Sequence, residues 1–330
     1  MIDGFLRRDM LFGLAQVEEL CKGILAREPN DIVRFRLLRD GLGYSPDHPE
    51  MRTLKLRLAR HPWVQELAAG QHPDGSWGRF HSMDSRLKQR FATSEAAIRR
   101  ALALGLDGQS PILARAVEYM QAVLKGRLAW TDRAERSEGW PICMEAITAG
   151  TLAQVDPAHP SIQKVGEYWA SIAERALASG RYEPQAEWKA HKEARGSGCI
   201  YLRSRYVLTL LAAKSAGLPP TLDRRILDWI WNDPQGIGYL GADLQHAQPF
   251  HIFNWLESLE ILSGFQSWDL PTRALDWLWS QRQADGLWDL GARVSKCLYF
   301  PLSDSWRKPG NRSMDHSVRV LALLRKYCDS

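Results

Sequence analysis

Asp315 and His316 are the residues of this 330-residue chain that we single out for catalytic chemistry. They lie in the run 313–321, where apolar residues recur at helical spacing. A carboxyl group sheltered among apolar side chains has a raised pKa and can act as an acid. An aspartate in the first turn of a helix also stabilises the helix dipole and the exposed N–H groups. The sequence leaves both interpretations of Asp315 open.

Metal chemistry is not expected from this sequence. Cys297, Asp315 and His316 are of the types that bind zinc. However, consecutive residues of a helix point about 100° apart, so Asp315 and His316 cannot easily share one ion. Glu187 and His191 are four residues apart, but they lie in a highly charged stretch and are expected to be solvated. We therefore predict no metal and no cofactor.

Composition narrows the class of protein. The chain is 45% hydrophobic and 25% charged, and its net charge of +5 is too small for a nucleic-acid-binding tail. Its 14 tryptophans require a large core or an aromatic pocket. The first residues carry charges where a signal peptide is apolar, and five scattered cysteines without a CxxC pair suggest reduced thiols. Reduced thiols are typical of a cytoplasmic protein, which we therefore expect, and no apolar run reaches the length of a membrane span.

A phrase of one acidic and one large apolar residue recurs about every 50 residues, which is typical of a helical-hairpin repeat. The copies are Glu66-Leu67, Glu118-Tyr119, Glu167-Tyr168, Asp228-Trp229 and Asp276-Trp277. A proline precedes several copies by about two turns, where it is suited to the first turn of a helix. These prolines are Pro111, Pro160, Pro220 and Pro271. Glycines such as Gly105, Gly217 and Gly264 follow the preceding helices and are expected to cap them in the left-handed conformation.

The hairpins predict an all-α fold with two kinds of helix. Residues 252–262 are apolar over a broad face and should be buried on most sides. The helix from Thr221 places Asp223 and Asp228 opposite its apolar residues and should face solvent there. An inner ring of buried helices within an outer amphipathic ring is an α/α toroid, which we expect over residues 61–330. An open solenoid of the same hairpins is the alternative.

Residues 1–60 differ from the repeat and are expected to form a basic helical cap. The segments 31–40 and 52–60 read as basic amphipathic helices. Helices that cap the end of a repeat array are usually solvated. The alternative is a surface for anionic head groups or pyrophosphate, which would allow peripheral contact with a membrane.

Two turns carry a specific motif. Residues 71–78 read Gln-His-Pro-Asp-Gly-Ser-Trp-Gly, and residues 281–288 read Gln-Arg-Gln-Ala-Asp-Gly-Leu-Trp; residues 233–239 are a degraded third copy. The glycine allows a tight turn, and the aspartate can accept hydrogen bonds from nearby backbone N–H groups. The motif resembles the QW repeat of squalene and oxidosqualene cyclases, which also occurs loosely in protein prenyltransferase β subunits. The resemblance implies the toroid fold and a stapling role for these residues.

The resemblance to the terpenoid cyclases and prenyltransferases also indicates which chemistry to look for. The DxDD and DDxxD motifs of the two cyclase classes do not occur in this chain. Oxidosqualene cyclases use a single aspartate, and Asp315, with His316 in place of a cysteine, is the nearest counterpart. The zinc site of the prenyltransferases uses Asp, Cys and His, but its spacing is not reproduced here.

We therefore predict a protein that binds an isoprenoid or a similar apolar ligand in a central cavity and that carries out acid-catalysed cyclisation or isomerisation at Asp315 and His316. The residues expected to line the cavity are Trp140, Glu145, Tyr201, Arg205, Tyr206, Phe250, His251, Asn254 and Trp255. The alternative is a non-catalytic toroid that binds a protein or a lipid. The sequence does not indicate the oligomeric state.

Overall fold

The computed structural model describes residues 11–82, 91–133, 139–247, 251–267, 272–292 and 300–328. These residues form helices joined by turns, and their only β pairing is an isolated parallel bridge between Ser204 and Gly238. The prediction of an all-α protein is therefore confirmed for the described residues. None of their helices is both long and apolar enough to cross a membrane. Cys297, Phe250 and Pro271 lie outside the described ranges.

The chain divides into two compact units, which we describe separately. Unit 1 joins the two ends of the chain, Met1–His61 and Asp269–Ser330, and unit 2 comprises Pro62–Trp268. The division expected from the sequence, at residue 60 with one toroid after it, stays a prediction.

Unit 1 packs the C-terminal helix against the N-terminal ones. Its elements are α1 (Leu14–Leu25), α2 (Asp31–Arg36), a π-helical turn η1 (Leu37–Gly41), α3 (Pro49–Ala59), α13 (Thr272–Ser280) and α14 (Pro309–Cys328). Helix α14 contacts α1, α2 and η1. Leu37 and Leu38 of η1 are buried, and so are Val320 and Leu324 of α14, which gives this unit its own core.

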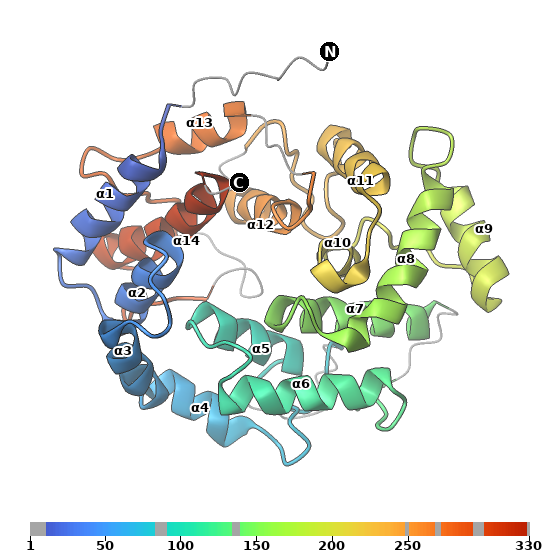
Figure 1. Cartoon of the computed structure of the whole chain (residues 1–330), viewed down its shortest axis with the longest axis horizontal. Coiled ribbons are helices and arrows are strands. Elements are labelled where there is room, and N and C mark those ends of the chain that lie inside the picture. Colours follow the sequence, from blue (N-terminus) through green and yellow to red (C-terminus); the bar gives the residue numbers. More distant parts are fainter. Residues whose placement is uncertain are drawn as a thin grey trace. The chain divides into compact units, whose positions relative to one another are not determined.

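Unit 2 contains the other helices. They are α4 (Pro62–Gly70), α5 (Ser94–Ala103), α6 (Pro111–Leu124), α7 (Trp140–Val155), η2 (Pro160–Ile162), α8 (Gln163–Ala176), α9 (Pro184–Arg195), α10 (Arg205–Leu211), η3 (Lys214–Ala216), α11 (Pro220–Asn232) and α12 (Ile252–Leu262). Helix α7 contacts α5 and α10, and α10 contacts α12, so that these four helices form one row (Figure 1). Helices α6 and α8 pack against α7, and α11 packs against α8, as a second row. The inner and outer rings expected from the hairpins, and their closure into a toroid, stay predictions.

The close approach of α7 and α10 depends on Gly150. A Cβ atom at this position would lie 2.4 Å from the carbonyl oxygen of Tyr206, so a side chain there would force the helices apart. Residues 146–153 of α7 are all buried, so this part of the helix is packed on every side. Gly150 thereby fixes the position of Tyr206, which belongs to the polar cluster described below.

The helix boundaries follow the local signals. Pro111 and Pro220 begin α6 and α11 as expected, and Pro160 begins η2. Gly105 and Gly217 adopt the expected left-handed conformation, with φ of 93° and 63°, but Gly264 does not. The expectation of a solvated face on α11 is wrong for Asp223, which is 2% exposed. Its carboxylate accepts hydrogen bonds from the backbone N–H groups of Gln266 and Ser267, so it holds a loop instead.

Candidate functional site

The two clear copies of the turn motif have the same hydrogen-bond arrangement. The indole N–H of Trp77 donates to the carbonyl of Leu67 at 2.8 Å, and that of Trp288 donates to the carbonyl of Leu278 at 2.7 Å. Each tryptophan is buried, and its backbone N–H donates to a serine hydroxyl of a later helix, Ser94 or Ser317. The motif therefore staples the end of one helix to a later helix, at the first residue of α5 in the first copy and inside α14 in the second.

The polar residues of the first copy complete this staple. Asp74 accepts a hydrogen bond from the N–H of Ser76 at 2.9 Å, as expected, and Gly75 has a φ of 91°. The side-chain amide of Gln71 donates to the carbonyls of Gly75 and Ile112, both at 2.9 Å. Because Ile112 belongs to α6, the glutamine ties this turn to the next hairpin through hydrogen bonds.

The structure places Asp315 inside α14, about two turns after its start at Pro309, so the interpretation of Asp315 as an aspartate in the first turn of a helix is wrong. Its side chain is buried, and it accepts hydrogen bonds from the N–H groups of Leu302 and Ser303 and from the Ser303 hydroxyl. Three donors surround the carboxylate, which is the environment of an ion that holds a loop.

His316 is also buried, and its Nδ1 accepts a hydrogen bond from the N–H of Leu290 at 3.0 Å. Burial lowers the pKa of His316 to about 3, although Asp289 acts in the opposite direction. The ring is therefore neutral near neutral pH. Both residues lie in unit 1, and their predicted catalytic role stays a prediction.

The residues predicted to line a cavity have several different environments in unit 2. Glu145 forms an ion pair with Arg195 at 2.5 Å, and His251 is exposed at the start of α12. Asn254 and the buried Trp255 hold a loop, because they donate to the carbonyls of Leu240 and Leu244. Trp140 is half-buried at the first position of α7. The structure brings together only Arg205 and Tyr206 in one described cluster, and Tyr201 lines a pocket.

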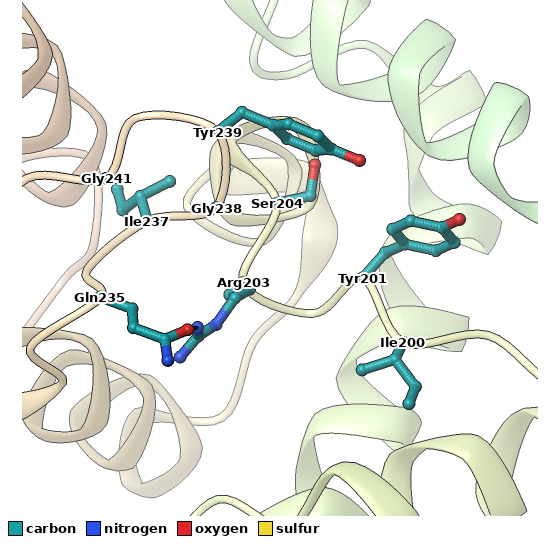
Figure 2. Close-up of a pocket in the computed structure, with 9 residues that line it drawn as sticks. All are labelled: Ile200, Tyr201, Arg203, Ser204, Gln235, Ile237, Gly238, Tyr239 and Gly241. Carbon is teal, nitrogen blue, oxygen red and sulfur yellow. Dashed lines mark hydrogen bonds between the residues drawn. The ribbon is translucent and has the colours of Figure 1, made fainter.

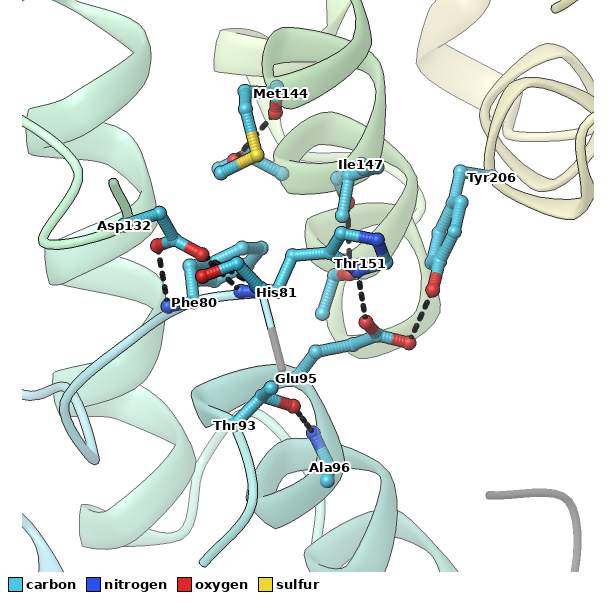
Figure 3. Close-up of polar contacts among 12 residues, drawn as sticks. Phe80, His81, Thr93, Glu95, Ala96, Asp132, Met144, Ile147, Thr151 and Tyr206 are labelled. Carbon is cyan, nitrogen blue, oxygen red and sulfur yellow. Dashed lines mark hydrogen bonds and ion pairs between the residues drawn. The ribbon is translucent and has the colours of Figure 1, made fainter. Parts of the chain in front are cut away.

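The polar cluster comprises His81, Glu95, Arg99, Arg205, Tyr206 and Glu257 (Figure 3 labels His81, Glu95 and Tyr206). Glu95 lies at its centre: its Oε2 is 2.9 Å from Nδ1 of His81, and its Oε1 accepts a hydrogen bond from the Tyr206 hydroxyl at 2.6 Å. Arg205 bridges the two carboxylates, at 3.8 Å from Glu95 and 3.0 Å from Glu257.

Arginines and glutamates alternate in this cluster. Arg99 also contacts Glu257 at 3.0 Å, so two arginines face two glutamates on α5, α10 and α12. Burial alone would raise the pKa of Glu95, but the hydrogen bond from His81 and the charge of Arg205 outweigh it and lower the pKa. Glu95 is therefore an anion that orients the His81 ring.

His81 is held by its backbone as well as by its ring. Asp132 accepts hydrogen bonds from the N–H groups of Phe80, His81 and Ser82, at 2.6 to 2.8 Å (Figure 3). The His81 side chain is 33% exposed, whereas that of Glu95 is 9% exposed. A carboxylate–histidine pair of this kind can accept or donate a proton at the second ring nitrogen.

A pocket of about 420 Å³ opens beside the start of α10, and we call it the tyrosine pocket (Figure 2). Its lining residues are Ile200, Tyr201, Arg203, Ser204, Gln235, Ile237, Gly238, Tyr239 and Gly241. In the view of Figure 2 the rings of Tyr201 and Tyr239 lie on one side, and Arg203 lies with Gln235 on the other. The volume is within the range of pockets that bind small molecules, about 300 to 1,000 Å³.

Buried side chains hold the walls of the tyrosine pocket. Glu187 accepts hydrogen bonds from the N–H groups of Tyr201 and Leu202 and from the Tyr182 hydroxyl. The expectation that Glu187 and His191 are solvated is therefore wrong, since both are fully buried. The charged neighbours of these two residues occupy the opposite face of α9, where Lys189 and Glu193 form an ion pair.

Arg203 is held by its own partners in the wall. It pairs with Asp233, donates to Gln235, and lies over the rings of Tyr182 and Trp229. The two rings stack on each other, with centroids 4.2 Å apart. The pairing with Asp233 neutralises the charge of Arg203 at this wall of the pocket.

The sequence places Tyr239 at the end of the degraded third copy of the turn motif, but it does not indicate a binding role for this residue. It has a φ of 67°, which is unfavourable for a side chain of this size, and it is 79% exposed. Glu95 was also missed, because an acidic residue in the first turn of a helix is common and has an ordinary stabilising role. No local pattern distinguishes Glu95 from other acidic residues at helix starts.

Metal ligands do not gather anywhere in the described ranges: no group of three or more His, Cys, Asp or Glu residues there is arranged to hold an ion. Comparison with family models, with curated proteins and with solved structures finds no match to this chain.

Proposed function

We propose that this chain is a helical-hairpin toroid related to terpenoid cyclases and protein prenyltransferases, and that it binds a neutral isoprenoid or a similar apolar molecule. The tyrosine pocket of unit 2 carries the proposal. It combines two tyrosine rings and two isoleucines with a small polar side, which suits an apolar chain that ends in a polar group. The geometry shared by the Trp77 and Trp288 turns supports the family relationship.

The electrostatics of the pocket favour a neutral head group. Asp233 pairs with Arg203, so a diphosphate would bring several negative charges close to a carboxylate. A hydroxyl or carbonyl group needs only one or two hydrogen bonds, which Gln235 and Ser204 can supply. We therefore propose an alcohol or a carbonyl compound as the ligand.

The conformation of Tyr239 supports a binding role. A non-glycine residue with a positive φ costs about 1 to 3 kcal/mol, and such residues are concentrated at functional sites. Tyr239 is also mostly exposed, so its ring gains little from burial to offset this cost. A ligand that packs between Tyr239 and Tyr201 would cover the exposed ring.

The test is a titration of the full chain with farnesol and with farnesyl diphosphate, followed by calorimetry. We expect saturable binding of farnesol and binding of the diphosphate that is about tenfold weaker. Tyr239→Gly removes the ring and should therefore weaken farnesol binding about tenfold or more. Glycine adopts the positive φ of this position without strain, so the unfolding temperature should not fall.

Ser305→Gly is the matched control, because Ser305 also has a positive φ, of 53°, but lies in unit 1. It should leave farnesol binding unchanged. Absence of saturable farnesol binding, or wild-type binding by Tyr239→Gly, would overturn the proposal and would favour the non-catalytic toroid that binds a protein.

A further inference from the structure

Two cysteines of unit 2, Cys143 and Cys199, lie close to each other although they are far apart in the chain. Both are free thiols. Cys143 belongs to the first turn of α7, and Cys199 lies in the loop that leads from α9 to the tyrosine pocket. This pair of thiols is not part of the polar cluster.

Contacts on both sides of Cys143 place Cys199 beside it. Gly139 lies one turn before Cys143, whose N–H donates to its carbonyl at 2.9 Å. A Cβ atom on Gly139 would lie 3.5 Å from Sγ of Cys199. Two residues after Cys143, Glu145 forms an ion pair with Arg195, which precedes the loop of Cys199. Because positions one turn apart on a helix are neighbours, the start of α7 and this loop bring the two thiols together.

The two thiols have different environments. Cys199 is 4% exposed, whereas Cys143 is only half-buried. Burial raises the pKa of the Cys199 thiol, and Glu187 and Cys143 raise it further, so Cys199 stays protonated. An electrostatic influence of Cys143 on Cys199 requires a short separation. An oxidant from solvent therefore meets Cys143 first, at the start of a helix, where the N–H groups favour a thiolate.

The loop of Cys199 holds one wall of the tyrosine pocket. Ile200 and Tyr201 line the pocket directly after Cys199. The loop begins with Gly196, which has a φ of 73°, and Gly198 precedes Cys199. Glycines allow the backbone to adjust, so Cys199 can reach the separation of about 3.5 to 4.5 Å between Cβ atoms that a disulfide needs.

We propose that hydrogen peroxide converts Cys143 and Cys199 into an intramolecular disulfide, which fixes the wall of the tyrosine pocket at Ile200 and Tyr201 against α7. The Cys143 thiolate attacks one oxygen of the peroxide, which gives a sulfenic acid and a hydroxide ion that takes up a proton. The sulfur of Cys199 then attacks the sulfur of Cys143, and the hydroxyl leaves with the Cys199 proton as water. Two thiols are oxidised, and one peroxide is reduced to two water molecules.

The bond between Cys143 and Cys199 forms without any ligand, and only its consequence for ligand binding rests on the function proposed above. The experiment therefore measures the bond and the pocket wall in the free protein. Failure of farnesol to bind would contradict the proposed function and would leave both of these readouts unchanged.

The test treats the reduced full chain with hydrogen peroxide, blocks the remaining thiols and maps the peptides by mass spectrometry without reduction. We expect one linked pair, the peptides that contain Cys143 and Cys199, which dithiothreitol separates. Hydrogen exchange of the Tyr201 and Leu202 amides should become about tenfold slower, because a cross-link restricts the opening of the loop.

Cys143→Ser and Cys199→Ser should each abolish the linked pair and the slower exchange. Cys328→Ser is the matched control, because it removes another partly exposed cysteine, in unit 1, and should leave both unchanged. Circular dichroism of each variant checks the fold. Oxidation of Cys143 to a sulfinic acid without a link, or links from Cys143 to other cysteines, would overturn the proposal. A Cys143–Cys199 link with unchanged exchange would overturn the effect on the pocket wall.

Discussion

His81 and Glu95 join a partly exposed ring to a buried carboxylate, with 2.9 Å between Nδ1 of His81 and Oε2 of Glu95. The same carboxylate accepts a hydrogen bond from the Tyr206 hydroxyl and faces the guanidinium of Arg205. The Glu95 carboxylate therefore connects α5, α10 and the loop of His81. Removal of one charge from such a network leaves the others uncompensated.

Glu95→Gln is therefore expected to destabilise the chain by about 3 kcal/mol at pH 7, because the amide cannot balance Arg205. The glutamine oxygen can still accept the hydrogen bond from the Tyr206 hydroxyl. The loss of stability therefore measures the effect of removing the negative charge. Urea unfolding gives the free energies. Glu118→Gln, at an exposed position of α6, is the control and should change stability by less than about 0.5 kcal/mol.

The effect of Glu95→Gln should also depend on pH. The pKa of Glu95 is lower in the folded chain than its usual value of 4.5, so its contribution is complete above pH 4.5 and is lost as the pH falls through the folded-state value. The difference between wild type and variant should therefore shrink in strong acid. A difference that stays constant down to pH 2 would contradict the assignment of an ionised Glu95.

The Trp77 staple predicts a specific cost for removal of its indole N–H. Trp77→Phe leaves the buried carbonyl of Leu67 without its donor and leaves a small cavity, so we expect a loss of about 2 to 4 kcal/mol. Trp288→Phe should behave similarly, since its indole bonds to Leu278 in the same way. Trp188→Phe, at a residue 42% exposed, is the control; a loss of equal size there would show that the staple is not the cause.

Asp315→Asn tests whether this carboxylate holds the loop of Leu302 and Ser303. The carboxylate accepts three hydrogen bonds. The NH₂ group of an asparagine would face some of these donors in place of an acceptor, so we expect the free energy of unfolding to fall by about 2 to 3 kcal/mol. Hydrogen exchange of the Leu302 and Ser303 amides should become faster. Asp304→Asn, an exposed neighbour, is the control. Unchanged stability and exchange in Asp315→Asn would return the residue to the list of catalytic candidates.

Local signals were enough to predict several helix starts and the two clear copies of the turn motif. A proline begins α6, and the sequence Gln-x-x-Asp-Gly-x-Trp of residues 71–77 adopts the stapled turn that its residue types require. These features depend on neighbours in sequence and on the backbone geometry that each residue type allows.

The burial of individual charges could not be predicted in the same way. Glu187 lies among charged residues, but α9 turns it toward the loop of Tyr201 and Leu202, where two N–H groups need an acceptor. Asp223 likewise holds a loop that begins 43 residues later in the chain. Asp315 holds a loop that lies 12 to 13 residues earlier. The partner of each carboxylate is set by tertiary packing, which periodicity within one helix does not reveal.

The buried His316 predicts a dependence of stability on pH. Its pKa is lowered from 6.5 to about 3 in the folded chain, mainly by burial. Between these values the unfolded chain binds a proton that the folded chain does not, so stability falls as the pH falls. From pH 6.5 to pH 5 we expect a loss of about 1.5 kcal/mol from this residue alone. His316→Asn keeps an acceptor for the N–H of Leu290 and cannot titrate, so it should lose that much less over the same range. Urea unfolding of both proteins at each pH gives the free energy of unfolding as a function of pH. If this free energy fell equally steeply for wild type and His316→Asn, the ring of His316 would already be protonated, or accessible to protons, in the folded chain.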